Sequence, residues 1–301
     1  MNEAATSPAR PVRPQRPREL QDGLNYYLYH PLAWQLARVL AKTPITPNMV
    51  SVVGACMVIG AGFAYAAPGW PLMALLGMAL HMGWHVVDGA DGDLARLTGR
   101  TSPVGEMVDG LCDYLSHLVL YVLLGGILAK TEGVFGGWHA GVLILIAAIS
   151  HAVQSNHVEV QRRQYQYWVY GTPWLRMSHG QSGSATSQSW AAALVSAYIG
   201  VASGMTPHAL RIDTAVAAAQ HDPARLAAIA AAVRAESPPL LRMCKILGPN
   251  PRAVVLGLSM VLAATPLWYL LYQAVILNLL LVLSLRLHNA AAKRIAAAIG
   301  A

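Results

Sequence analysis

The chain has 301 residues, of which 55% are hydrophobic and only 12% are charged. Soluble proteins carry about 25% charged residues, so much of the apolar surface here needs lipid to cover it. The formal charge of +7 is distributed around hydrophobic stretches rather than along one solvated face, which argues against a nucleic-acid partner.

The N-terminal region precedes the first apolar segment. Residues 1–22 are rich in Pro and Arg and lead into no short apolar core with a cleavage site, so we expect a retained, disordered cytoplasmic arm. Residues 23–43 have leucines at a spacing of four, accompanied by tyrosines, and are predicted to form an amphipathic helix on the cytoplasmic interface. Pro44 and Pro47 end this helix, and Thr46 is a candidate N-cap for the next.

Apolar segments of helical character make up much of the remaining chain. Most of them approach the ~20 residues that a helix needs to cross a ~30 Å hydrocarbon core. We therefore predict an all-α integral membrane protein with six transmembrane helices, preceded by the interfacial helix. The six segments run from Ile45 to Ala66, Pro71 to Ala95, Val104 to Ala129, Trp138 to about Arg162, Pro251 to Ala264, and Leu267 to His288.

These segments define the expected organisation of the chain. Residues 44–162 contain helices 1–4, with a catalytic motif at 88–113, and residues 251–288 contain helices 5 and 6. Residues 163–250 are predicted as a cytoplasmic helical insert, and residues 289–301 as a cytoplasmic tail. The apolar patch Trp190–Ser203 is a candidate for a seventh span, but Gly200 within it, Gly204 directly after it and its short length favour the insert.

The distribution of basic residues predicts the orientation in the membrane. Of the 21 Lys and Arg residues, Lys130 is the one that falls in the loops opposite the N-terminal arm under the six-span arrangement. Because cytoplasmic loops carry the excess of Lys and Arg, both termini and the turn between spans two and three should face the cytoplasm. The composition, low in Phe and high in Ala and Arg, favours a bacterial source and hence the inner membrane.

Four aspartates lie at the junction of spans two and three. Asp88 and Asp91 are three residues apart and Asp109 and Asp113 are four apart, so each pair shares one face of a helix. A short turn between the helices would bring both pairs together. Carboxylates are unfavourable at membrane depth and usually mark a functional site. Divalent cations with oxygen ligands would compensate their charge, and two such ions can hold both sides of a phosphoryl displacement.

The aspartates belong to a longer pattern. The run Asp88-x2-Asp91-Gly92-x2-Ala95-Arg96-x8-Gly105-x3-Asp109-x3-Asp113 resembles the complete signature of the CDP-alcohol phosphotransferase family, with all eight fixed positions at the family's spacing. The six-span pattern and the preceding interfacial helix also resemble that family, whereas the stretch 163–250 is longer than expected.

The resemblance implies a role for each motif position. Asp88, Asp91 and Asp109 would be ligands of two Mg²⁺ ions, for which Mn²⁺ could substitute, and Asp113 would complete the site and act as general base. Gly92, Ala95 and Gly105 would leave room for the nucleotide, and Arg96 would hold the motif or the phosphates. The resemblance also implies a homodimer.

Several other polar residues near these segments are candidates for weaker roles. Arg162, Arg163 and Arg252 would either anchor helix ends or form a pocket for an anionic substrate, and His117 would contact the acceptor. The residues that we interpret as structural are His81 and His85, as buried hydrogen-bonded histidines, and Asp93, as a solvated or capping residue.

We therefore expect an enzyme that transfers a phosphatidyl group from a CDP-activated donor, CDP-diacylglycerol in the first instance, to a small polar alcohol, with release of CMP. One alternative is transfer of a phospho-head group from a CDP-alcohol to a lipid alcohol. A divalent cation transporter could also place aspartates at membrane depth, but it would favour broken helices or inverted repeats, which the two halves of this sequence do not show.

Overall fold

The computed structural model describes residues 16–131, 133–172 and 207–300, and every regular element in these ranges is helical. The chain divides into two compact units. We call the residues up to Ile127 together with Met260–Ala264 the N-terminal unit, and Leu128–Ser259 together with the residues from Thr265 the C-terminal unit. The candidate span Trp190–Ser203 lies outside the described residues.

Helices long and apolar enough to cross a membrane are present in both units, which supports the expected integral membrane protein. The second predicted span corresponds to the helix α3, Leu72–Leu97, which carries the first two motif aspartates. This helix is long enough to cross a membrane, but it is less apolar than the helices that qualify as candidate membrane spans. The five stretches of the described residues that do qualify are Pro47–Ala66, Val104–Ala129, Trp138–Tyr170, Pro223–Ala263 and Leu267–Ala298.

The N-terminal unit begins with short helical turns and continues with long helices. The 3₁₀ turn η1 (Arg18–Leu20) and the π-helical turn η2 (Asn25–Tyr29) lead into α1 (His30–Leu40), which is followed by α2 (Pro47–Ala66), α3 and α4 (Pro103–Ala129). Thr46 caps α2 as predicted, because its side chain accepts a hydrogen bond from the backbone N–H of Met49.

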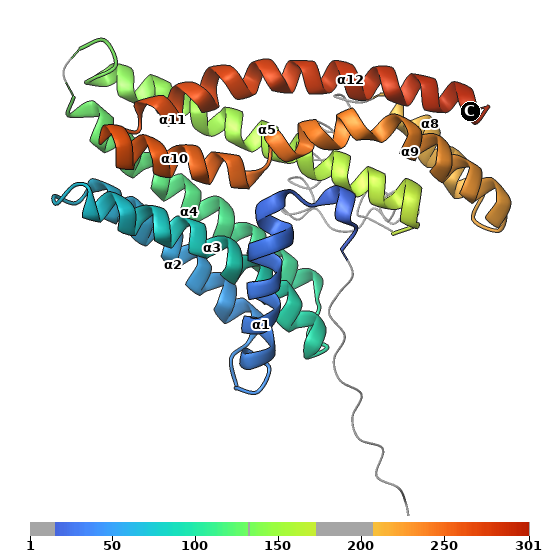
Figure 1. The fold of residues 1–301 in the computed structure, drawn as a ribbon, viewed down its shortest axis with the longest axis horizontal. Helices are drawn as coiled ribbons and strands as arrows, with labels where there is room; N and C mark the ends of the chain where they lie inside the picture. The colour runs from blue at the N-terminus through green and yellow to red at the C-terminus, as the bar shows by residue number, and fades with distance from the viewer. Residues whose placement is uncertain (1–15, 132, 173–206, 301) are drawn as a thin grey trace, which may run out of the picture. The chain divides into compact units, whose positions relative to one another are not determined.

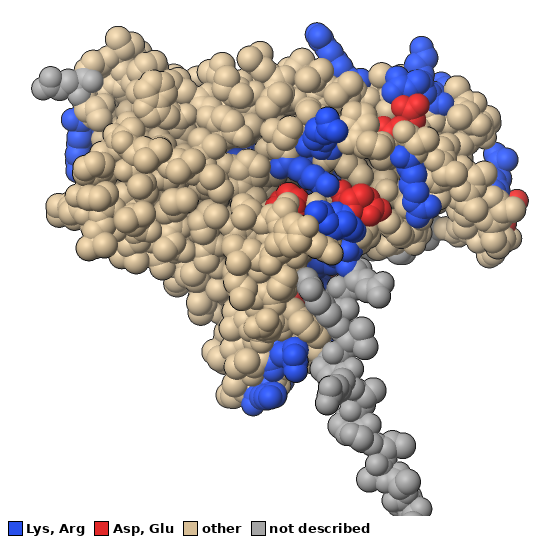
Figure 2. Space-filling view, in the orientation of Figure 1, with Lys and Arg blue, Asp and Glu red and all other residues tan. Residues whose placement is uncertain are grey.

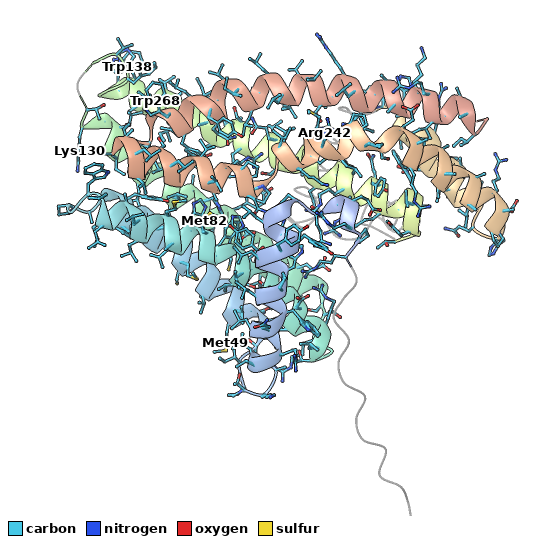
Figure 3. All side chains as sticks on the ribbon, in the orientation of Figure 1. Met49, Met82, Lys130, Trp138, Arg242 and Trp268 are labelled. Carbon is cyan, nitrogen blue, oxygen red and sulfur yellow. The ribbon has the colours of Figure 1, made fainter. Side chains whose placement is uncertain are left out.

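The core of this unit forms where α1, α2 and α3 meet (Figure 1). Small residues allow the helices to approach closely: a Cβ atom on Gly77 would lie 2.6 Å from the ring of Tyr65 on α2. The hydroxyl of Tyr29 donates to the sulfur of Met82 where η2 reaches α3 (Figure 3). The buried residues at the centre are Ala33, Ala37, Val50, Ala90 and Leu94.

The N-terminal arm differs in part from the sequence-based expectation. We expected a solvated tail through residue 22, but Arg16 bonds Asp93 on α3, Gln21 bonds His30 on α1, and Gln21 is 5% exposed. Residues 1–15 lie outside the described residues.

The C-terminal unit is built from α5 (Trp138–Tyr170), α8 (Ala209–Ala218), α9 (Pro223–Ile246), α10 (Pro249–Ala263) and a last helical stretch. That stretch comprises α11 (Leu267–Leu271), the π-helical turn η3 (Tyr272–Ile276) and α12 (Leu277–Ala298). Helix α5 continues two turns beyond the predicted end near Arg162 and stops at Gly171, which adopts a left-handed conformation.

The surface of the molecule agrees with a membrane environment. On the face shown in Figure 2 most of the surface carries neither basic nor acidic side chains. Trp138 and Trp268 are exposed at the starts of α5 and α11, and Figure 3 places both at the same end of the C-terminal unit as Lys130. Tryptophan favours the membrane–water interface, so this end is suited to lie at one.

Candidate metal centre

A tight turn joins the helices that carry the aspartates. Gly99, at φ +64°, follows the end of α3; its N–H donates to the carbonyl of Arg96, and the N–H of Arg100 donates to that of Ala95. These two bonds form a Schellman motif, which requires a left-handed residue such as glycine. Ser102 then caps α4 by accepting from the N–H of Gly105, and Pro103 occupies the first position of the helix.

The turn brings side chains from the end of α3 and the start of α4 together. Carboxylate oxygens of Asp88, Asp109 and Asp113 lie within 4.8 Å of one another. The carboxylate of Asp88 also lies close to that of Asp113, and the carboxylate of Asp91 lies close to that of Asp109. All four predicted aspartates therefore meet in one cluster, each at least partly withdrawn from solvent.

Asp91 is held in place from two sides. The hydroxyl of Ser51 on α2 donates to Asp91 Oδ2 at 2.6 Å, and the backbone N–H of Gly92 lies 2.5 Å from Oδ1. Sequence reasoning did not single out Ser51, which lies 40 residues from Asp91 and becomes its neighbour only through the packing of α2 on α3.

The donor set fits a divalent metal. Three carboxylates within a few ångströms supply hard oxygen ligands of the kind that Mg²⁺ prefers. Among the described residues, the ion pairs that α3 makes form at Asp93 rather than at the four motif aspartates. The arginines next to this region therefore pair with Asp93, and a cation bound between the four motif carboxylates would compensate the negative charge of those carboxylates.

The small motif residues lie in the same region, close to the turn between α3 and α4. A Cβ atom on Gly92 would lie 3.5 Å from both terminal nitrogens of Arg96, so this guanidinium folds back over the glycine. A Cβ atom on Gly105 would approach the Ser102 hydroxyl to 3.2 Å. Ala95 is partly exposed one turn beyond Asp91. The nucleotide role that we expect for Gly92, Ala95 and Gly105 stays a prediction.

Aromatic side chains lie beside the aspartates on the side away from the turn. Trp84 is within hydrogen-bonding reach of the Asp113 carboxylate, and its ring centroid is 4.8 Å from that of His117. His117 Nδ1 donates to the carbonyl oxygen of Asp113. His81 and His85 are buried, as expected, but His81 Nδ1 and His85 Nε2 make no hydrogen bond, and both rings instead stack with neighbouring aromatic groups.

The three arginines that we proposed for an anion pocket belong to the C-terminal unit. Arg163 is exposed and pairs with Glu159 at 2.6 Å, one turn earlier on α5. Arg162 is half-buried. Arg252 is 3% exposed and donates to the Ser155 hydroxyl at 2.6 Å, so it joins α10 to α5.

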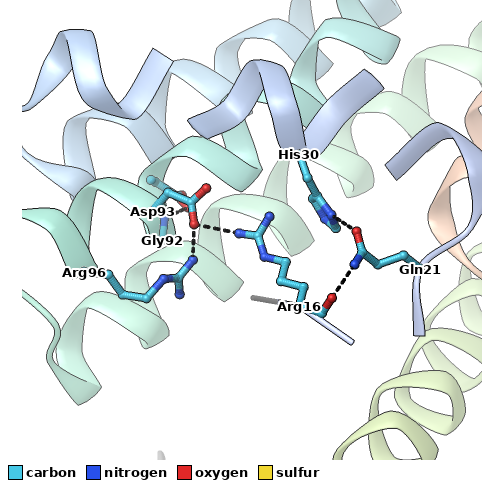
Figure 4. Close-up of polar contacts among 7 residues, drawn as sticks. Arg16, Gln21, His30, Gly92, Asp93 and Arg96 are labelled. Atoms are coloured by element: carbon cyan, nitrogen blue, oxygen red, sulfur yellow. Dashed lines mark hydrogen bonds and ion pairs between the residues drawn. The ribbon is translucent and has the colours of Figure 1, made fainter. Parts of the chain in front are cut away.

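Asp93 is the residue of this region that sequence reasoning interpreted wrongly. It is 1% exposed and therefore not solvated, and its Oδ1 accepts from Arg16 at 2.7 Å and from Arg96 at 2.5 Å (Figure 4). The arginine of the motif thus has a buried carboxylate as its partner. The partner from the arm, Arg16, is 77 residues away in sequence, and no local pattern marks it.

Residues 44–202 match the family model described as CDP-alcohol phosphatidyltransferase, which is more than half of the chain. The chain belongs to this family. The members of the family use divalent metals, in agreement with the acidic cluster on α3 and α4.

Three known proteins are similar to parts of this chain. Inner membrane protein YnjF from Escherichia coli is 37% identical over 110 residues, which are 36% of this chain and 50% of that protein. Cholinephosphotransferase 1 from Xenopus laevis is 30% identical over 112 residues, 33% of this chain and 27% of that protein. Archaetidylinositol phosphate synthase from Pyrococcus horikoshii is 30% identical over 95 residues, 31% of this chain and 48% of that protein.

The similar regions thus span half or less of these relatives. No solved structure matches the chain.

Proposed function

We propose that this protein is a membrane-embedded transferase that moves a phosphatidyl group from CDP-diacylglycerol to a small polar alcohol and releases CMP. The observation that carries this proposal is the convergence of Asp88, Asp109 and Asp113 within 4.8 Å, inside the complete family signature. Membership of the family supports phosphatidyl transfer in phospholipid synthesis as the reaction class.

The proposed division of labour follows from the chemistry of the cluster. Two Mg²⁺ ions, when bound by Asp88, Asp91, Asp109 and Asp113, would neutralise the diphosphate and make CMP a better leaving group. Ser51 keeps Asp91 oriented for this role. Gly92 leaves space for the nucleotide, and Arg96 beside it supplies positive charge for phosphate oxygens.

Asp113 is the proposed general base. An alcohol is a weak nucleophile until a positioned group takes its proton. In the proposed reaction the alcohol oxygen forms a bond to the β-phosphorus, the bond from this phosphorus to CMP breaks, and the hydroxyl proton passes to Asp113. The half-buried His117, which is bonded to the backbone of Asp113, would contact the acceptor.

The second arrangement, transfer of a phospho-head group from a CDP-alcohol to a lipid alcohol, is favoured by the similarity to a cholinephosphotransferase. The similarity to an archaetidylinositol phosphate synthase favours the first arrangement. A screen of the purified protein separates them: CDP-diacylglycerol with water-soluble alcohols on one side, and CDP-choline or CDP-ethanolamine with diacylglycerol on the other. CMP release should occur with the first set; release with the second set alone would replace our donor assignment.

We further propose a six-span topology in a bacterial inner membrane, with the insert 163–250, the interfacial helix and the active site on the cytoplasmic side, and a homodimer as the assembly. Exposed Tyr26, Tyr27 and Leu28 before α1 support the interfacial position, and an inner membrane protein is among the relatives. The arginines Arg162, Arg163 and Arg252 remain predicted contacts for an anionic group.

The topology can be tested with single cysteines at Gly133 and His221 in a background without Cys56, Cys112 and Cys244. A membrane-impermeant thiol reagent should label position 133 from the periplasmic side and position 221 only after the membrane is opened. If both positions react from one side, the span count is wrong.

A further inference from the structure

The N-terminal arm is attached through Arg16 to the stretch of α3 that carries the first two motif aspartates. Arg16 bonds Asp93 Oδ1, the atom that also accepts from Arg96 (Figure 4). Asp93 lies two residues after Asp91, and the positive charge of Arg16 also acts on the carboxylate of Asp88. The arm therefore brings a guanidinium within electrostatic range of Asp88, one of the aspartates that we propose to hold the donor's diphosphate.

The position of Arg16 is fixed at its backbone as well as at its side chain. The buried Gln21 donates from Nε2 to the carbonyl oxygen of Arg16 at 2.7 Å, and its Oε1 lies 2.7 Å from Nδ1 of His30 at the start of α1 (Figure 4). Because Arg16 is already held in place, a ligand that binds it loses less free energy in ordering this residue.

Two guanidiniums, those of Arg16 and Arg96, converge on the one buried carboxylate of Asp93. The side chains of Arg16 and Arg96 are 26% and 48% exposed, so a ligand can reach both. A guanidinium has five N–H donors in a planar fork that suits phosphate oxygens.

We propose that Arg16 is a substrate-binding residue that, together with Arg96, binds phosphate oxygens of a nucleoside diphosphate ester. The inference rests on the proposed function, since it takes the CDP-linked donor as the ligand. In this arrangement Asp93 positions the two arginines, and the arm contributes directly to the donor site.

The test compares the affinities of two ligands that differ only in the diphosphate. CDP and cytidine are measured by displacement of radiolabelled CDP from the full-length protein in detergent with Mg²⁺. Arg16→Gln should weaken CDP about tenfold, the size expected for one lost charge-assisted hydrogen bond, and leave cytidine unchanged. With substrate, the KM for the donor should rise more than kcat falls.

The matched control is Arg18→Gln. Arg18 lies two residues further along the arm and has the same charge, but it stacks on the ring of Tyr26 at 4.1 Å and bonds the carbonyl of Gln21. This variant should bind CDP as the wild type does. Thermal unfolding monitors the fold of each variant, and if Arg16→Gln unfolds early, Arg16→Lys must still weaken CDP more than cytidine.

Three results would overturn the inference: unchanged CDP affinity in Arg16→Gln, an equal loss for CDP and cytidine, or the same loss in Arg18→Gln. If the wild-type protein binds no CDP, the proposed function itself fails, and the donor site with it.

Discussion

The two units of this molecule both bury polar side chains, but they satisfy them in different ways. In the N-terminal unit four carboxylates gather with mainly one another as neighbours. In the C-terminal unit several buried side chains of opposite hydrogen-bonding character bond one another: Gln154 donates to Asn278 at 2.8 Å and accepts from Gln273 at 2.6 Å. The four aspartates and the side chains around Gln154 all lie in or next to predicted membrane helices.

The comparison of these two sets of buried side chains indicates that the carboxylate cluster is the one that needs a ligand. In the C-terminal unit His157 and Ser284 lie 2.9 Å apart, and Arg252 bonds Ser155, so side chains of α5 bond those of α10 and α12 and hold the helices together. Four carboxylates on two helices cannot satisfy one another while all of them are ionised. Uncompensated charge of one sign, rather than polarity itself, therefore marks the site.

The largest expected effect follows from removing one charge of the carboxylate cluster. Asp109→Asn keeps the size of the side chain but removes its charge, and should reduce transfer by more than about a hundredfold, because a bound metal contributes several kcal/mol of transition-state stabilisation. CMP release in detergent measures it. Glu106→Gln, an exposed carboxylate one turn earlier on α4, is the control and should stay near wild type. Near-normal activity in Asp109→Asn would refute the metal assignment.

A second prediction compares two aspartates of the cluster, Asp113 and Asp88, to which we assign different roles. Asp113→Asn should retain donor binding but lose transfer by about 10²–10⁴-fold, the usual contribution of a general base. Asp88→Asn should weaken CDP binding, because it removes a proposed metal ligand. Donor affinity and turnover are measured for both variants. If Asp113→Asn loses donor affinity as completely as Asp88→Asn, then Asp113 is chiefly a ligand.

The smallest effect on catalysis is expected in the C-terminal unit. Gln154→Leu leaves buried partners of Gln154 without their bonds, and should lower the free energy of unfolding by about 2 kcal/mol. Ile149→Leu, at an exposed position of the same helix, should leave stability unchanged. Turnover per folded molecule should fall far less than in Asp109→Asn; a loss of the same size would mean that this network also serves the reaction.

The sequence predicted those parts of the structure that depend on local patterns. Thr46 and Pro47 predict the start of α2. The spacing of three residues between Asp88 and Asp91, and of four between Asp109 and Asp113, predicts that the aspartates lie on facing sides of α3 and α4. Gly99, which ends α3, was overlooked although its left-handed position follows from an ordinary helix-end rule.

Contacts between distant residues could not be predicted in this way. The burial of Asp93 depends on Arg16, and the orientation of Asp91 depends on Ser51. Neither pair has a local spacing that would reveal it, because each contact forms only when separate elements pack together. The continuation of α5 to Tyr170 likewise has no apolar periodicity to predict it, since the residues beyond Arg162 are largely polar or aromatic.

The most direct test of the central claim counts the metal ions. Mn²⁺ bound to the purified protein is titrated by electron paramagnetic resonance, with and without CDP. We predict two ions per chain in the presence of CDP, and a loss of at least one of them in Asp109→Asn, while Glu106→Gln retains both. Equal Mn²⁺ binding by the wild type and Asp109→Asn, or no binding above background in the wild type, would contradict the assignment of the four aspartates as a two-metal centre.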